Sequence, residues 1–426
     1  MRARTISLGI AITILLLVLA LPAATSDYTL EVFGNANEDE TINMQDVTYT
    51  ELIILEYRDK TDLADAKHDG KINMQDVTQI ELVILGKEKE ITLIDETERV
   101  VTVDKPIERL VAGYRHPIET LRSLKVPKEM IVGVEETWLD PVFFPEFADT
   151  PTVGIVWNPD VEAILSLNPD LVILYGSTSP SREGALATAT DVLELAGVTV
   201  IRVSLTRPET YPELVVKIGY VFDREEEADE FNEFIRRCLS SVSETTTIPE
   251  EDMPKVYFES SFGPYNVIME SCQPYIGMAG GKDVFAGLSG NIDPEAVVEQ
   301  NPAIIVKKAP REYRDRIGYG VDADDTEAME EIRDEILNRL ELQNVDAIKT
   351  GQVYVICGYL TPGGPVSGTR SFLLPAYLAK MFHPDRFEDV DPTMLHQEYI
   401  TEFQGLEIDP DEKGVFVYPR LEGCES

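Results

Sequence analysis

Short apolar runs alternate with longer amphipathic segments over most of the chain, from Ile91 onward. The short runs predict buried strands, and the longer segments, whose apolar residues recur at helical spacing, predict helices. Such alternation is typical of α/β layers. The predicted strands are Arg109–Ala112, Met130–Val134, Leu171–Leu174, Val198–Arg202, Lys255–Glu259, Ala303–Val306 and Val353–Cys357, and helices are expected between them, for example at Glu183–Ala196 and Ser371–Met381.

One predicted helix is unusually long and lies midway along this region. Between Arg224 and Val242, the apolar residues keep helical spacing and the other positions are charged. A further helical stretch, Pro212–Phe222, precedes it. We expect this linking segment, about residues 211–246, to join two lobes rigidly, with lobe 1 at about 92–210 and lobe 2 at about 251–415.

The first 26 residues form a different pattern. Arg2 and Arg4 precede an apolar run from Ile6 to Leu21, and small residues follow up to Ser26. This order is typical of a secretory signal peptide, and an uncleaved N-terminal anchor is the alternative. We therefore expect an exported, extracytoplasmic protein.

A short repeat separates the N-terminal run from the α/β region. The segments INMQDVTYTELIIL, from Ile42, and INMQDVTQIELVIL, from Ile72, agree at 11 of 14 positions. A polar loop leads into each, Asn35–Asp46 and Asp65–Asp76. Both loops place oxygen-bearing groups where a chain can wrap a calcium ion. The expected ligands are Asn35, Asn37, Asp39, the carbonyl of Thr41, Asn43 and Asp46 in the first loop, and Asp65, Asp69, the carbonyl of Lys71, Asn73 and Asp76 in the second.

These two loops, each followed by one helix, resemble a type I dockerin over roughly residues 30–88. The resemblance implies Ca²⁺ as the cofactor and a cohesin-like protein as the partner. Glu40 departs from the pattern, because a Gly is usual at its position and Gly70 keeps it. Lys67 departs as well, because an ammonium group cannot ligate calcium. Two helix-capping loops without metal, or a spacer that lifts the next domain off the membrane, are the alternatives.

Charge narrows the range of partners. The chain has 77 Asp and Glu against 37 Lys and Arg, a formal net charge of -40. Such a charge argues against nucleic acid and against anionic membrane surfaces. We attribute most of it to a solvated acidic surface suited to salt.

The four cysteines, Cys238, Cys272, Cys357 and Cys424, have no zinc-motif spacing, and sequence alone does not pair them.

A second repeat relates the two lobes. NPDVEAILSLNPDLVIL, from Asn158, and IDPEAVVEQNPAIIV, from Ile292, share Asp-x-Glu-Ala, two aliphatic residues and then Asn-Pro before a strand. With KPIERLVA at Lys105–Ala112 and the following HPIETLRSLKVPKEMIVGV, the first of these segments resembles the iron-complex and vitamin B12 class of ABC-transporter substrate-binding proteins. The resemblance covers about residues 92–415.

This resemblance implies two Rossmann-like α/β lobes joined by a long rigid helix, here preceded by a small all-α calcium loop–helix domain. The ligand is then expected at the carboxyl ends of the strands, in the cleft between the lobes. Aromatic and cationic side chains at these ends suit a metal chelate or a tetrapyrrole, such as an iron siderophore, haem or cobalamin. The candidate ligand contacts are Tyr114, Arg115, His116, Trp138, Trp157, Tyr175, Phe262, Tyr265, Tyr359 and Arg370.

The resemblance also implies partners: an ABC permease and its ATPase. In the vitamin B12-binding members, one surface Glu on each lobe docks onto arginines of the permease. Glu162 and Glu295 occupy those positions within the second repeat. Because each is also placed to stabilise the start of a short helix, a purely structural role is the alternative.

Two other functions are alternatives to transport. An enzyme is not expected, because the sequence has no Gly-x-Ser-x-Gly elbow, no phosphate-binding Walker loop and no His-Glu-x-x-His motif. A scaffold-attached or cell-surface recognition protein, which would use the dockerin-like segment to bind a cohesin-type partner, is the second rival.

Overall fold

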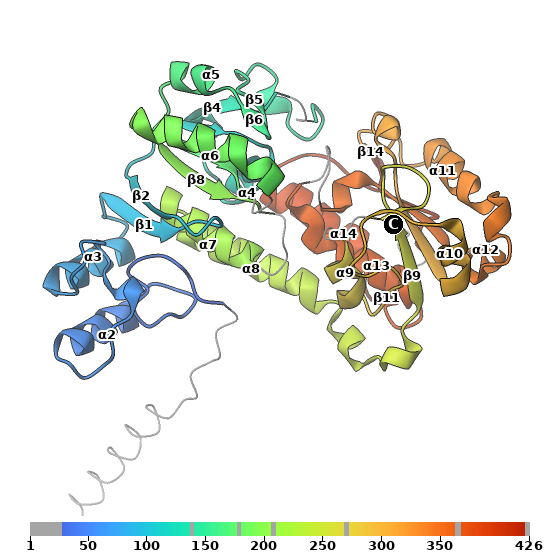
Figure 1. Ribbon diagram of the computed structural model, residues 1–426, viewed down its shortest axis with the longest axis horizontal. Coiled ribbons are helices and arrows are strands. Elements are labelled where there is room, and N and C mark those ends of the chain that lie inside the picture. Colours follow the sequence, from blue (N-terminus) through green and yellow to red (C-terminus); the bar gives the residue numbers. More distant parts are fainter. Residues whose placement is uncertain are drawn as a thin grey trace, which may run out of the picture. The chain divides into compact units, whose positions relative to one another are not determined.

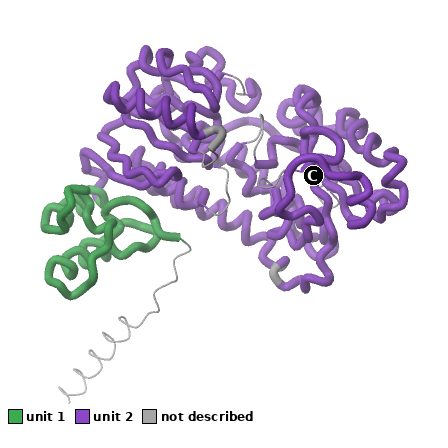
Figure 2. Tube along the Cα trace, in the orientation of Figure 1, with its two compact units in different colours: residues 1–84 green, residues 85–426 purple. Residues whose placement is uncertain are grey.

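The structure, a computed structural model, describes residues 28–136, 140–176, 180–205, 210–267, 272–362 and 368–421. The predicted signal or anchor at residues 1–26 therefore lies outside the described residues. Among the helices that are described, none combines the length and the apolar character needed to cross a membrane. The chain divides into two compact units, residues 1–84 and 85–426 (Figure 2).

The first unit is built from the loop–helix repeat. Its helices α2 (Met44–Ile54) and α3 (Met74–Ile84) pack together, and the 3₁₀ turn η1 (Asp62–Ala64) lies between them in sequence. Ala36, Ile53 and Ala64 form a small core, against which Tyr49 and Ile72 pack. The repeated sequence thus yields two similar helices.

The second unit begins with lobe 1, whose parallel sheet has the strand order β4-β3-β7-β8. Four of the five residues of β7 are buried, because the strand is apolar on both faces and lies inside the sheet. The antiparallel hairpin of β1 and β2 comes before this sheet in the chain. The elements are β1 (Glu90–Ile94), β2 (Val100–Asp104), β3 (Leu110–Ala112), α4 (His116–Ser123), η2 (Lys128–Met130), β4 (Ile131–Val134), η3 (Pro145–Phe147), β5 (Gly154–Ile155), β6 (Asn158–Pro159), α5 (Val161–Ser166), β7 (Leu171–Tyr175), α6 (Pro180–Leu195) and β8 (Thr199–Val203).

Two helices, α7 (Tyr211–Phe222) and α8 (Glu225–Ser240), form the linking segment (Figure 1). Helix α7 ends at Asp223, which adopts the left-handed conformation with φ 54°. The buried face of α8 includes Ala228, Phe231 and Phe234. Helix α8 packs against α4 of lobe 1 and, in lobe 2, against η9 and α13, described below. The helical backbone is confirmed, but the segment is two packed helices with a break, and α8 ends before residue 246.

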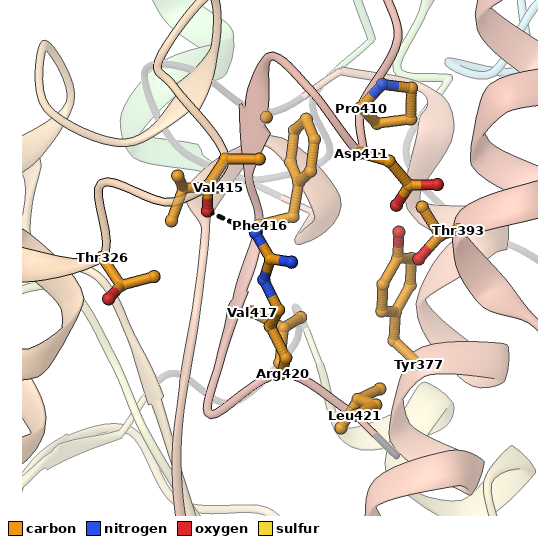
Figure 3. Close-up of a pocket in the computed structure, with 12 residues that line it drawn as sticks. Thr326, Tyr377, Thr393, Pro410, Asp411, Val415, Phe416, Val417, Arg420 and Leu421 are labelled. Carbon is orange, nitrogen blue, oxygen red and sulfur yellow. Dashed lines mark hydrogen bonds between the residues drawn. The ribbon is translucent and has the colours of Figure 1, made fainter. Parts of the chain in front are cut away.

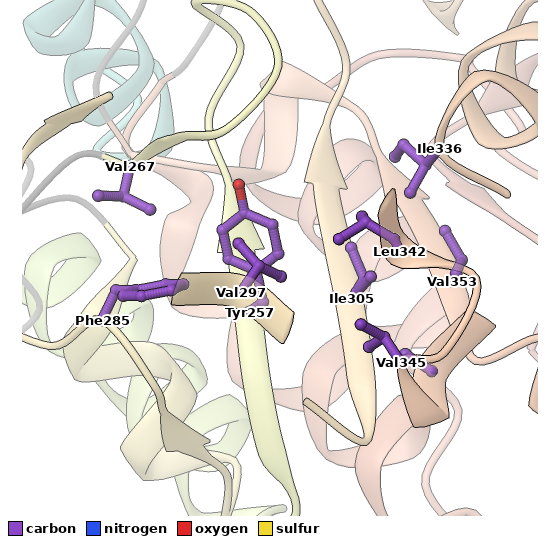
Figure 4. Close-up of a cluster of buried hydrophobic side chains, with 10 residues drawn as sticks. Tyr257, Val267, Phe285, Val297, Ile305, Ile336, Leu342, Val345 and Val353 are labelled. Atoms are coloured by element: carbon purple, nitrogen blue, oxygen red, sulfur yellow. The ribbon is translucent and has the colours of Figure 1, made fainter. Parts of the chain in front are cut away.

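Lobe 2 contains a sheet of order β11-β9-β13-β15-β17, parallel except for β17. Figure 4 shows its core, where Tyr257 and Ile305 of neighbouring strands lie among apolar side chains such as Leu342 and Val345. The elements are η4 (Ser243–Thr247), η5 (Glu250–Asp252), β9 (Lys255–Glu259), β10 (Asn266–Val267), α9 (Gln273–Met278), β11 (Lys282–Asp283), β12 (Gly290–Asn291), α10 (Pro294–Gln300), β13 (Ile304–Lys308), η6 (Arg311–Tyr313), β14 (Gly318–Tyr319), α11 (Glu327–Leu337), η7 (Leu340–Leu342), α12 (Asp346–Thr350), β15 (Val353–Ile356), η8 (Gly358–Leu360), η9 (Arg370–Leu373), α13 (Leu374–Phe382), α14 (Pro392–Glu398), the π-helical turn η10 (Tyr399–Phe403), β16 (Gly414–Val415) and β17 (Val417–Tyr418).

Candidate functional site

A buried ion pair joins helix α4 of lobe 1 to the turn η9 of lobe 2. Glu119, in the first turn of α4, accepts hydrogen bonds from Arg370, at the start of η9: Nη2 lies 2.5 Å from Oε1, and Nε lies 3.2 Å from Oε2. Both side chains are at most 1% exposed. Tyr399 donates a further hydrogen bond to the carboxylate, at 3.0 Å. Burying two charges is costly unless such partners satisfy them, so this cluster holds the lobes in one arrangement.

Arg370 was predicted as a ligand contact, and the structure places it in this interlobe pair. Its guanidinium carbon also lies 3.9 Å from the ring centre of Phe143 of lobe 1. A second tie between the lobes is the hydrogen bond that the hydroxyl of Tyr359 donates to Asp140. Two of the predicted contacts, Arg370 and Tyr359, therefore bind side chains of lobe 1 and lie between the two lobes.

Aromatic side chains gather at the strand ends of lobe 1. The ring centres of Tyr114 and Tyr175 are 5.4 Å apart and edge-to-face, and Trp157 packs on Tyr175 in the same way, at 4.9 Å. His116 lies 5.4 Å from Tyr114, and its Nδ1 is 3.2 Å from the carbonyl oxygen of Ser204. Burial raises the pKa of Tyr114 far above its ordinary value. The structure thus brings four of the predicted contacts together, whereas Trp138 lies outside the described residues.

Arg115 lies at the end of the same loop and is almost fully buried. Its Nη1 is 3.6 Å from Oε1 of Glu135, which follows β4. Burial raises the pKa of Glu135, and the charge of Arg115 counteracts that rise only in part. Arg115 therefore supplies a buried cation at the carboxyl end of the lobe 1 sheet.

In lobe 2, the loop after β9 is held by a buried carboxylate. Glu259 accepts hydrogen bonds from Arg339, with Nη1 at 2.6 Å, from the Tyr257 hydroxyl at 2.9 Å and from the Tyr265 backbone at 2.9 Å, and it pairs with Lys307 at 2.7 Å. Burial raises the pKa of this carboxyl, but the hydrogen bonds and charges of Arg339 and Lys307 outweigh burial and lower it overall. This network fixes the loop.

The same loop carries two predicted ligand contacts, Phe262 and Tyr265. Phe262 is 75% exposed. Tyr265 has its ring beneath the guanidinium of Arg339, with 4.7 Å between the ring centre and the guanidinium carbon, and its hydroxyl donates to Glu341 at 2.6 Å. Phe262 is thus open to solvent, whereas Tyr265 packs within its own lobe.

A cationic pocket in lobe 2 was missed by the sequence reasoning. Lys308 is buried at the end of β13, and Arg311 and Arg314 follow it. Together with Tyr359 and other residues of the loops after β13 and β15, these side chains line one pocket. The signal was present in the sequence, since KKAPREYRDR at residues 307–316 has five basic residues in a strongly acidic chain.

A second pocket lies near the C-terminal segment and has a different lining. Figure 3 shows Tyr377, Thr393 and Asp411 on one side of it and Phe416 and Arg420 on the other. Arg420 donates a hydrogen bond to the carbonyl oxygen of Ala323 at 2.7 Å. None of the predicted ligand contacts lines this pocket.

The proposed docking glutamates occupy equivalent positions. Glu162 lies in the first turn of α5 and Glu295 in the first turn of α10, and both are exposed. An aspartate caps each helix: Asp160 accepts from the backbone of Ala163 at 3.0 Å, and Asp293 accepts from that of Glu295 at 2.9 Å. Each cap satisfies one backbone N–H of its helix start, and the two glutamates are exposed to solvent.

The two predicted calcium loops fold alike at their last position. Asp46 accepts backbone hydrogen bonds from Asn37 and Asn43, at 3.1 and 2.8 Å, and Asp76 accepts them from Lys67 and Asn73 at the same distances. The backbone conformation differs at the sixth position of the two loops, since Gly70 has φ +83° and Glu40 does not adopt a positive φ.

The predicted calcium loops carry oxygen groups of the kind that a hard cation binds. Burial raises the pKa of Asp46 to about 6, and the charge of Asp39 adds to this rise, so a bound cation would stabilise both carboxylates. In the described part of the chain, however, no three His, Cys, Asp or Glu side chains are gathered closely enough to hold a metal. Calcium binding would therefore need the asparagine and carbonyl oxygens of the loops as well.

The fold and this arrangement of strand-end loops define a two-lobed binding protein. The sequence model of the periplasmic binding protein family matches residues 110–359, and the chain belongs to that family. It is therefore a periplasmic-type substrate-binding protein of the kind that serves ABC transporters.

Two relatives are similar to the chain in sequence, and one solved structure is similar to it in fold. The chain is 23% identical over 354 residues to the molybdate-binding protein MolA of Haemophilus influenzae, which covers 75% of this chain and 92% of the relative. It is 27% identical over 224 residues to YvrC of Bacillus subtilis, an uncharacterised ABC transporter substrate-binding lipoprotein, covering 51% of this chain and 68% of the relative. The TroA-like periplasmic binding protein FepB of Veillonella parvula has a similar fold, with a TM-score of 0.64, 24% identity, and coverage of 76% of this chain and 98% of FepB.

Proposed function

We propose that the protein captures an iron complex, either a siderophore or haem, or a corrinoid, outside the cytoplasm and delivers it to an ABC permease driven by its ATPase. The half-buried aromatic side chains of Tyr175 and Trp157 carry the proposal, because flat aromatic faces suit a large chelate or tetrapyrrole, and the buried Tyr114 packs on Tyr175. The buried cation Arg115 lies beside this cluster in sequence and suits an anionic group on such a ligand.

A small oxyanion such as molybdate is the second candidate. Two observations favour it: the relative from Haemophilus influenzae is a molybdate-binding protein, and Lys308, Arg311 and Arg314 line a pocket in lobe 2. A pocket lined by cations can bind a compact divalent anion without an aromatic platform.

A thermal-shift screen of the purified protein tests both candidates. The probes are a ferric siderophore, haemin, cyanocobalamin and sodium molybdate, because a ligand that binds only the folded state raises the melting temperature. At a free concentration 100 times the Kd, the stabilisation is about 2.7 kcal/mol. An unchanged melting temperature with all four probes would reject the proposed ligand classes.

Glu162 and Glu295 are proposed to dock onto the permease. The double variant Glu162→Arg/Glu295→Arg should abolish ligand uptake by cells while the purified variant keeps its ligand affinity. The matched control is Glu299→Arg in α10, which reverses an exposed charge of the same helix outside the duplicated position. Loss of ligand affinity in the purified double variant would contradict a docking role.

We propose that the two loops of the loop–helix unit bind Ca²⁺. We propose that this unit, with calcium bound, binds a cohesin-like protein. The duplicated hydrogen bonds of Asp46 and Asp76 support equivalent roles for the two loops. Calorimetric titration with calcium should show binding, which Asp46→Ala weakens at the first loop. If the wild-type protein shows no heat of calcium binding, the calcium proposal is wrong, and the two loops only cap their helices. A cohesin-type partner would favour the alternative function of a scaffold-attached recognition protein.

A further inference from the structure

The second repeat, which relates the two lobes, extends to residues upstream of Asn158 and Ile292. In each lobe a glycine with a left-handed backbone precedes an aliphatic residue, with φ +84° in lobe 1 and φ +81° in lobe 2. An Asn, the capping Asp and the exposed Glu follow at the same spacing in both lobes. These positions are Gly154, Ile155, Asn158, Asp160 and Glu162 in lobe 1, and Gly287, Leu288, Asn291, Asp293 and Glu295 in lobe 2.

The aliphatic residue of this pattern is exposed in both lobes. Ile155 is 38% exposed and Leu288 is 49% exposed. Val298 is also 38% exposed, and it lies one turn after Glu295 on the same face of α10. Single exposed aliphatic residues are common on protein surfaces and need no explanation. An exposed aliphatic residue at the same position of two lobes, seven residues before an exposed Glu, indicates a shared role for the two positions.

In lobe 1, Ile155 and Glu162 line one surface groove. The β5–β6 hairpin and the start of α5 form this groove, and Figure 1 shows these elements together in lobe 1. The backbone N–H of Asp160 donates to the carbonyl oxygen of Val153 at 2.8 Å. A β-carbon at Gly154 would lie 2.7 Å from the nitrogen of Asp160, so this close approach requires glycine. The backbone therefore fixes the shape of the groove.

The groove combines an apolar side chain with negative charge. Glu136, Asp160 and Glu162 line it, and none of its described lining residues is Lys or Arg. In lobe 2, Asp293 and Glu295 at the start of α10 give the same combination with the exposed aliphatic residues. A partner that fits both patches must therefore present a cation beside an apolar side chain, once for each lobe.

The first turns of α5 and α10 lie at equivalent edges of the two sheets. Helix α5 leads into β7 and α10 leads into β13, and these strands run parallel to their neighbours β3 and β9. A helix that connects parallel strands runs back along the sheet, so it begins at the edge where the strands end. The loops proposed to hold the ligand lie at the same edges. A partner on both patches would therefore face these loops.

We propose that Ile155, Leu288 and Val298 are apolar anchors of the permease-docking surface, beside Glu162 and Glu295. The inference rests on the proposed function and deepens it, because it gives the docking surface an apolar component. The partner is the extracytoplasmic face of the permease, with two like contact regions. Each region presents a Lys or Arg next to an aliphatic side chain.

Salt gives the apolar component a physical reason. The net charge of -40 suits the chain to salt, and at 1 M salt the screening length is only about 3 Å. Contacts between exposed carboxylates and cations are weakened under these conditions. Burial of aliphatic side chains does not depend on charge, so anchors of this kind keep the two proteins together where the glutamates alone would not.

Binding of the purified protein to its permease–ATPase complex, held in nanodiscs of neutral lipid, tests the anchors at 0.1 and 1 M NaCl. Ile155→Ser/Leu288→Ser/Val298→Ser should weaken binding about 10- to 100-fold at both salt concentrations, because three partly exposed aliphatic side chains lose their contacts. Glu162→Gln/Glu295→Gln should weaken binding mainly at 0.1 M, because 1 M NaCl already screens the charges. The different salt dependence of the two variants separates the apolar contacts from the charged ones.

Two control variants separate docking from a general effect of the substitutions. Replacement of the three aliphatic residues by Met should retain most of the affinity, because Met keeps an apolar side chain of similar size. The matched control replaces three exposed apolar residues outside the patches and should bind like the wild-type protein: Val192→Ser/Leu195→Ser/Met394→Ser. Circular dichroism of the anchor variant should show a melting temperature close to that of the wild-type protein, because the replaced side chains are exposed.

The outcomes are distinct for the anchors and for the proposed function. Equal binding of the wild-type protein and the anchor variant at both salt concentrations would overturn the anchors and leave the proposed function standing. An equal loss of binding in the matched control would do the same. If the wild-type protein does not bind the complex at either salt concentration, the anchors fall together with the proposed delivery to a permease.

Discussion

At the scale of single residues, His396 shows how burial sets the behaviour of the protein toward acid. Its Nε2 lies 2.6 Å from the Tyr319 hydroxyl and its Nδ1 lies 3.2 Å from that of Tyr377. Burial lowers the pKa of His396 to about 3, and the charge of Arg370 adds to this effect. The imidazole is therefore neutral in the folded protein at pH values well above 3.

Acid should destabilise the protein through His396. Above pH 6.5 neither state binds a proton at this residue; below it the unfolded state binds one and the folded state does not. The free energy of unfolding should then fall by about 1.4 kcal/mol per pH unit from pH 6.5 toward pH 3. Urea unfolding at pH 7.5 and 5.0 gives the change in the free energy of unfolding with pH. This change should be larger for the wild-type protein than for His396→Gln. His68→Gln, at an exposed position, is the control and should behave like the wild-type protein. An equal pH dependence of the free energy of unfolding in the wild-type protein and in His396→Gln would contradict this role of His396.

The residue scale is also where sequence reasoning stopped short. The position of Arg370 after a strand could be predicted, but its partner Glu119 is 251 residues away, and only the fold brings them together. The basic run that contains Lys308 is visible in the sequence, but the burial of this lysine at the end of β13 depends on the fold. Which way a strand-end side chain points depends on contacts between lobes, which periodicity does not encode.

At the scale of elements, the apolar pattern predicted most strands well. The expected strand Lys255–Glu259 is observed as such, and Leu171–Leu174 is one residue longer. Runs that are apolar on both faces are easy to recognise because both faces of these sheets are covered. The break between α7 and α8 also falls where the predicted stretches Pro212–Phe222 and Arg224–Val242 meet, at Asp223, which ends α7 in a left-handed conformation usually taken by Gly.

The close packing of α7 on α8 depends on Gly219. A β-carbon there would lie 2.8 Å from Cβ of Ala228 and 3.1 Å from the carbonyl oxygen of Arg224. Gly219→Ala should therefore destabilise the protein by about 1–3 kcal/mol, the usual cost of overpacking. Gly184→Ala in α6 is the control, because open space surrounds that position, and it should stabilise by about 0.5–1 kcal/mol through helix propensity. Chemical denaturation measures the free energy of unfolding of both variants. Equal changes in Gly219→Ala and Gly184→Ala would contradict close contact between α7 and α8.

At the scale of the whole molecule, the net charge of -40 acts against the compact state. Salt shortens the screening length from about 10 Å at 0.1 M to about 3 Å at 1 M, so repulsion between surface carboxylates weakens. The melting temperature should rise when NaCl is raised from 0.1 to 1 M, as measured by circular dichroism. A melting temperature that falls over this range would show that surface repulsion is not the dominant electrostatic effect.

The two tryptophans offer the most direct test that ligand binds at the strand ends of lobe 1. Trp157 packs on Tyr175 at 4.9 Å, and Trp138 follows β4 in the sequence. Fluorescence titration of the purified protein with the ligand found by thermal shift should give a saturable change at one ligand per chain, and Trp157→Phe should reduce its amplitude. A tight ligand that leaves the fluorescence of both tryptophans unchanged would contradict this placement of the binding site.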